Sequence, residues 1–293
     1  MQSSKSLKFK DIIFIFLPLL VMLFIQYGVI IADYIIIFIR NVISDEKTAS
    51  AFSVELIMTR DYNQPMNLAY VTLVRYIVYI VVFGIWLRKI SSASERKQLI
   101  TCPSIPAIPF IIVAGIAGQF FVDSALTLVR PFFSNAFSEY DKQVTSQVFG
   151  ASASYVLYFA IFFVAPIAEE LLFRGLIQKY VGKFFHEIMD KGADLCTVLF
   201  QALLFGIYHG NIIQGIYAFV LGILLGFLAV RFNSLIPGII FHIAINTSIL
   251  LTFLTLYFFK TTATTIISGV VCMIILAGCI WLAVKIQKRK YDK

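Results

Sequence analysis

The chain has 293 residues, of which 60% are hydrophobic and only 14% are charged. A soluble globular domain is about 45–50% apolar and about 25% charged, so this chain has too few charges to cover a water-facing surface. The formal net charge of +8 does not indicate a nucleic-acid partner. Its cations lie in short loops and at the two tails, where basic residues orient membrane spans. We therefore expect a membrane-embedded protein whose surroundings are the lipid bilayer.

Apolar stretches recur along the whole chain, and each is long enough to cross a hydrocarbon core of ~30 Å. The first, residues 11–39, is too long for the core of a signal peptide, and no small-residue cleavage site follows it. We predict an all-α fold, a polytopic transmembrane helix bundle of about eight spans. It forms one domain over residues 1–293, with three spans in residues 1–150. The predicted spans are Ile12–Ile39, Asn67–Leu87, Pro106–Val129, Val148–Phe173, Leu195–His209, Ile212–Val230, Leu235–Phe259 and Thr265–Val284.

Basic residues predict the orientation of the bundle. Three lysines precede the first span, four cations lie in residues 88–97, and five follow Val284, whereas residues 40–65 have mixed charge. By the positive-inside rule, both termini are expected in the cytoplasm. The richness in Ile, Phe and Lys is typical of an AT-rich bacterial genome, so we expect a bacterial cell membrane. Charged and aromatic residues alternate in 179–191, which predicts an amphipathic helix at the membrane interface.

Two adjacent carboxylates and an arginine lie where the fourth predicted span ends. An ionisable residue at mid-depth costs about 2.5–3.5 kcal/mol on insertion scales, so such residues usually have a function. Glu170 and Arg174 are four residues apart on one helical face, which predicts an ion pair. Glu169 lies about 100° around the helix and lacks that partner. One paired and one unpaired carboxylate suit general-base catalysis. A charge cluster that merely anchors the helix end is disfavoured, because anchoring needs a basic residue rather than two acids.

Two of the three histidines also lie in apolar stretches. They are His209, four residues after Phe205, and His242, which shares a helical face with Asn246. A lone buried histidine is more often structural, but two of them beside an intramembrane Glu-Glu pair favour catalysis. The third, His186, begins a sequence like His-Glu-x-x-His in which Asp190 replaces the second histidine. We expect it on the surface.

Three further charged residues, Asp33, Arg75 and Asp123, are predicted toward the outer ends of their spans. We interpret them as one structural network on the outer side, away from any catalytic group.

Three motifs together resemble those of the CPBP intramembrane proteases, the family of the CAAX prenyl endopeptidases and the bacteriocin-processing or Abi proteins. They are Glu169-Glu170-x-x-x-Arg174, Phe205-x-x-x-His209 and His242-x-x-x-Asn246. Each is weak alone, but all three occur in the order typical of the family, each on its own span. The likeness covers roughly residues 151–250, and the first 150 residues show no recognisable mark.

The resemblance implies an intramembrane catalytic cavity and hydrolysis of a peptide bond in a membrane-associated, hydrophobic or lipid-anchored peptide. Glu169 would activate the attacking water with help from His209, and His242 and Asn246 would stabilise the oxyanion. Glu170 and Arg174 would form a supporting ion pair. In the other version Glu169, His209 and His242 hold a divalent metal such as zinc. Asparagine is a poor zinc ligand but a natural oxyanion donor, which favours the version without a cofactor.

Two other functions stay open from the sequence. The first is a catalytically inactive peptide-binding or immunity membrane protein of the same fold, which would have no need for an unpaired intramembrane carboxylate. The second is a proton-coupled transporter, which would also bury Glu and His residues. The sequence shows no internal repeat to support a transporter.

Overall fold

The computed structural model describes residues 9–44, 65–145 and 154–291, and within these ranges all regular structure is helical. Seven helical segments are long and apolar enough to cross a membrane, so the protein is a multi-pass helical bundle. The longest helices are α1 (Phe9–Ser44), α3 (Pro65–Ile90), α5 (Ile108–Val129), α11 (Ile212–Phe232) and α14 (Thr262–Tyr291). Shorter ones are α4 (Ala93–Leu99), α6 (Ser134–Val144), α10 (Ala193–Tyr208), α12 (Ile236–Ser248) and α13 (Thr255–Phe258).

The helix that contains both glutamates differs most from its predicted span. It runs continuously from Tyr155 to Ile188 rather than ending at Phe173, while residues 148–153 of the prediction lie outside the described residues. Its parts are α7 (Tyr155–Phe159), a π-helical turn (Ala160–Val164), α8 (Ala165–Glu170), a second π-helical turn (Leu171–Ile177) and α9 (Gln178–Ile188). Pro166 lacks the N–H that would bond the carbonyl four residues earlier, which is compatible with a widened turn before it.

The amphipathic segment is therefore helical but not separate. It forms α9, the end of this long helix, which covers Gln178–Ile188, and its place at the membrane interface stays a prediction. The fifth predicted span is α10, which has 16 residues. It is about 24 Å long at ~1.5 Å per residue, shorter than a hydrocarbon core of ~30 Å.

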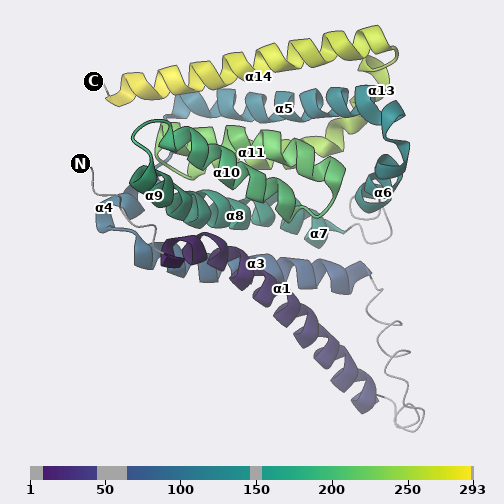
Figure 1. Ribbon diagram of the computed structural model, residues 1–293. Coiled ribbons are helices and arrows are strands. Elements are labelled where there is room, and N and C mark those ends of the chain that lie inside the picture. The colour runs from purple at the N-terminus through teal and green to yellow at the C-terminus, as the bar shows by residue number, and fades with distance from the viewer. Residues whose placement is uncertain (1–8, 45–64, 146–153, 292–293) are drawn as a thin grey trace.

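Most of the helices begin or end at one of two opposite ends of the bundle (Figure 1). α1 begins and α14 ends at the same end, where α4 and α9 also lie, whereas α6 and α13 lie at the other. Hydrogen bonds join the segments at the α4 end: Ser104 N donates to Gln287 Oε1 at 2.8 Å, and Leu235 N donates to Leu99 O at 2.9 Å. Lys179 of α9 pairs with Glu95 of α4 at 2.9 Å. The backbone N–H of Ser92, which donates to this carboxylate, and then the Lys179 ammonium lower the pKa of Glu95 to about 2, well below its usual range.

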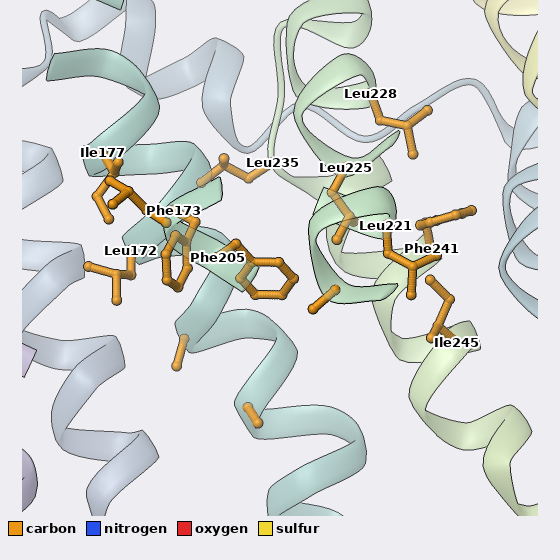
Figure 2. Packing of buried hydrophobic residues seen from close by; sticks show 14 of the residues in the cluster. Leu172, Phe173, Ile177, Phe205, Leu221, Leu225, Leu228, Leu235, Phe241 and Ile245 are labelled. Atoms are coloured by element: carbon orange, nitrogen blue, oxygen red, sulfur yellow. The ribbon is translucent and has the colours of Figure 1, made fainter. Parts of the chain in front are cut away.

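The core packs around aromatic side chains from the helices that carry the motifs. Figure 2 shows Phe173 and Phe205 facing each other within it, with ring centroids 4.9 Å apart in an edge-to-face arrangement. α10 and α11 approach very closely, since a Cβ built on Gly206 would lie only 2.6 Å from Gly215 O. Small residues allow such close backbone packing within a membrane, where van der Waals contact is a main source of helix association.

Candidate active site

A cavity of about 420 Å³ opens inside the bundle, lined by side chains from α1, α3, α5, α6, α8, α10, α11 and α12. Four of the six predicted site residues line it: Glu169, His209, His242 and Asn246. Glu170 and Arg174 lie behind this lining and are almost fully buried, with 0% and 4% of their surfaces exposed. The structure thus brings all three motifs, which are far apart in the sequence, to one place.

The Glu170–Arg174 ion pair expected from the four-residue spacing is present, with Nη1 to Oε1 at 2.9 Å. Arg174 also donates from Nη2 to Gly222 O at 3.2 Å, and its guanidinium lies 4.4 Å from the centroid of the Phe205 ring. The same Glu170 oxygen lies 3.0 Å from His242 Nδ1. Because an ionised carboxylate only accepts hydrogen bonds, His242 must donate from Nδ1. Glu170 therefore fixes the positions of both Arg174 and His242.

His242 stands between the two glutamates. Its Nδ1 faces Glu170, and its Nε2 lies 3.7 Å from Glu169 Oε2, which is too long for a hydrogen bond. Glu169, unlike Glu170, forms no short ion pair among the described residues. Its carboxylate is mostly buried but faces the cavity. Glu169 therefore lacks the short contacts that Glu170 makes, and its nearest ionisable partner among the described residues is His242 at 3.7 Å.

His209 and Asn246 are held by backbone carbonyls. His209 Nδ1 lies 2.8 Å from Phe205 O, and since a carbonyl only accepts, Nδ1 carries the proton. Neutral His209 then has an unprotonated Nε2 on the other side of the ring. Asn246 Nδ2 donates one N–H to Ile161 O at 3.1 Å, which leaves its second N–H available.

The turn after α10 places His209 at the cavity. Gly210 adopts a positive φ of 67°, and the Asn211 side chain caps α11 by accepting from Ile213 N and Gln214 N. The predicted spans Val148–Phe173 and Leu195–His209 put Glu169 four residues from the end of one span and His209 at the far end of the next, which would keep the two side chains apart. That conflict came from ending the fourth span at Phe173. Measured from the α9–α10 loop at ~1.5 Å per residue, His209 lies about 24 Å along α10 and Glu169 about 28 Å along its own helix.

The prediction that Asp33, Arg75 and Asp123 form one network away from any catalytic group was wrong for Arg75. Arg75 forms no ion pair among the described residues and instead lines the same cavity as Glu169. Asp123 accepts a hydrogen bond from Gln119 Nε2 at 2.9 Å. A signal for Arg75 was available in the sequence, because it lies ten residues after the start of α3 rather than at a span end. His186 lies on the surface, as expected, beside Asp194 at 3.0 Å.

The metal-binding alternative does not fit the donor geometry. Within the described ranges, no three His, Cys, Asp or Glu side chains are close enough together to hold a metal ion. Glu169, His209 and His242 line one cavity without converging on one point.

Comparison with known families supports the resemblance. Residues 151–248, about a third of the chain, match the model of the family described as Type II CAAX prenyl endopeptidase Rce1-like. The match includes all six predicted site residues and confirms the resemblance to the CAAX-type membrane proteases over this part of the chain. No curated protein and no solved structure matches the chain.

Proposed function

We propose that the protein is an intramembrane endopeptidase that hydrolyses a peptide bond of a membrane-associated or hydrophobic peptide. The observation that supports it best is the division of labour between the two glutamates. Glu170 is bound by Arg174 and His242, whereas Glu169 faces the cavity with no short ion pair among the described residues. A site that only bound a peptide would have no reason to retain this second buried carboxylate.

In the proposed mechanism, Glu169 removes a proton from a water molecule as that water attacks the carbonyl carbon of the peptide bond. His209 helps to hold the water through its unprotonated Nε2. The new C–O bond produces a tetrahedral oxyanion, and Asn246 donates its second N–H to it. When the C–N bond breaks, Glu169 returns the proton to the leaving amine.

His242 is assigned to the oxyanion as well. Its Nδ1–H is held by the Glu170 carboxylate, so its Nε2 can donate only when the ring is an imidazolium. The carboxylates of Glu170 and Glu169, at 3.0 and 3.7 Å from the ring nitrogens, together balance Arg174 and such a cation. The roles of the two histidines thus follow from their Nδ1 partners, a carbonyl for His209 and a carboxylate for His242.

The test is cleavage by the purified full chain in detergent micelles. Two fluorogenic peptides serve as probes, one carrying an S-farnesyl cysteine and one carrying an apolar segment of similar length without the lipid. Glu169→Ala is expected to lower cleavage by a factor of about 10²–10⁴, the usual contribution of a general base. The matched control is Glu187→Ala, because Glu187 is an exposed carboxylate on α9.

Cleavage by wild type and by Glu187→Ala, and its loss in Glu169→Ala at an unchanged melting temperature, would support the proposal. Retention of more than a few per cent of activity by Glu169→Ala would contradict the general-base assignment. Binding of both peptides without any cleavage would favour the inactive peptide-binding alternative. Preference for one of the two probes decides whether the substrate carries a prenyl group.

A further inference from the structure

Among the described residues that line the cavity, Arg75 is the one charged side chain besides Glu169 and the two histidines. The remaining polar lining is uncharged and includes Gln119, Gln214 and the hydroxyl groups of Tyr140 and Tyr217, which lie 3.5 Å apart. Glutamine amides and phenols suit hydrogen bonding to a peptide backbone. A guanidinium requires a stronger partner, because an uncompensated charge within a membrane is costly.

The contrast with Arg174 shows what Arg75 lacks. Arg174 has a carboxylate at 2.9 Å, a carbonyl at 3.2 Å and an aromatic ring at 4.4 Å. Arg75 has no carboxylate or carbonyl partner among the described residues: its guanidinium lies 5.2 Å from the centroid of the Tyr76 ring, and its polar neighbours are the phenol groups of Tyr76 and Tyr208. The charge of Arg75 acts on Glu169 across the cavity, but the two side chains form no ion pair.

We propose that Arg75 binds a carboxylate group of the peptide substrate and so determines which peptides are cut. The inference rests on the proposed function, since it places a substrate in the cavity beside Glu169. A guanidinium can grip a carboxylate through two parallel hydrogen bonds, which gives both strength and orientation. The carboxylate is either the C-terminus of the peptide or an acidic side chain on the same side of the scissile bond.

If Arg75 only positioned or polarised Glu169, its removal would change the kinetic constants in a different way. If Arg75 acted only on the charge of Glu169, its loss would lower kcat equally for all peptides and displace the pH profile. Loss of a carboxylate-binding group instead raises KM, and only for peptides that carry the carboxylate.

The experiment uses peptides of one sequence that end either in a free carboxylate or in a carboxamide, each with Asp or Asn near the C-terminus. Wild type, Arg75→Gln and Arg75→Lys are compared by KM and kcat in the full chain. Arg231→Gln is the matched control, because Arg231 lies at the same distance, 5.2 Å, from an aromatic ring but outside the cavity lining. We expect Arg75→Gln to raise KM at least tenfold for peptides with the recognised carboxylate, with partial recovery in Arg75→Lys.

The two changes to the peptide, a carboxamide for the C-terminal carboxylate and Asn for Asp, identify which carboxylate Arg75 binds. A KM effect lost in the carboxamide identifies the C-terminus, and one lost in the Asn peptide identifies the side chain. An equal loss on all four peptides, or no loss, would overturn the assignment. Binding of the same peptides to Glu169→Ala, measured by fluorescence anisotropy, keeps this test separate from the proposed function. If no peptide is cut but Arg75→Gln still weakens binding of the carboxylate form, the proposed function fails and the assignment of Arg75 stands.

Discussion

At the scale of single residues, Glu170 connects the site to the core through one oxygen, Oε1, which accepts from both Arg174 and His242. Removing one partner of a buried ion pair typically costs about 3–5 kcal/mol, because the other charge is left uncompensated. Arg174→Ala should therefore lower the melting temperature in detergent more than the double change Glu170→Gln with Arg174→Gln. In the double variant the amide oxygen at position 170 can still accept from His242.

Thermal unfolding of the purified variants in the same detergent measures this difference. Activity should fall in Arg174→Ala as well, since His242 would lose the fixed position of its partner. If Arg174→Ala has the same melting temperature as wild type, the ion pair does not stabilise the fold, and another role has to be assigned to Arg174.

Sequence reasoning reached some of these residue contacts and missed others for a physical reason. Glu170 and Arg174 lie on one helix, where a spacing of four determines which side chains meet. His242 and Glu170 are in contact although they are 72 residues apart in the sequence, and Arg75 lines the cavity from α3. Such contacts depend on how helices pack, so the motif resemblance could group the histidines with Glu169 but could not say which histidine faces which glutamate.

At the scale of helices, the position of α12 depends on its close contact with α5. A Cβ built on Gly115 of α5 would lie 2.6 Å from Ala244 Cβ and 2.7 Å from Phe241 O. One of these atoms is backbone, so the two helices would have to separate. α12 carries His242 and Asn246, and its displacement would move both relative to Glu169.

Gly115→Ala is accordingly expected to destabilise the protein by about 1–3 kcal/mol, the usual cost of overpacking, and to lower peptidase activity. Gly84→Ala is the matched control, because a Cβ on Gly84 of α3 meets no atom within 4 Å. Alanine is favoured over glycine in a helix by about 1 kcal/mol, so this control should not lose stability. Melting temperatures and cleavage rates of the two variants measure the effect, and equal behaviour would show that α5 and α12 tolerate the added methyl group.

The existence of the helices was predictable, but their ends were not. Among the described residues, seven of the eight predicted spans are helices long enough to cross a membrane, the fifth being the shorter α10, and the all-α bundle is confirmed. The fourth helix continues through α9 because charged residues on one face do not stop a helix whose other face still packs. Gln178 and Val181 of α9 are buried on the packed face. The average hydropathy of the segment falls because it contains charged residues, and it does not distinguish the two faces of the helix.

At the scale of the whole molecule, cations concentrate at the end of the bundle where α1 begins and α14 ends (Figure 1). The described cations of this end include Arg88, Lys89, Arg96, Lys97, Arg231, Lys285 and Lys288. At the opposite end, the described cations are fewer: Lys142, Lys260 and Arg130, which is paired with Asp141. By the positive-inside rule this asymmetry favours the α4 end as the cytoplasmic one. The α4 end of the bundle, with α9 beside it, would then face the cytoplasm.

The native Cys102 offers a direct measurement of this orientation. It is exposed in the segment between α4 and α5, which Ser104 ties to the end of α14. The other three cysteines lie in the apolar helices α10 and α14 and are only partly exposed, so a water-soluble reagent reaches them less readily. A membrane-impermeant maleimide should therefore label the protein only after the membrane is opened, and Cys102→Ser should abolish that labelling. Ser138→Cys in the Cys102→Ser background places an exposed thiol on α6 at the opposite end, and it should react in intact cells. Labelling of Cys102 in intact cells, with protection of the thiol at position 138, would show that the bundle is inserted the other way round.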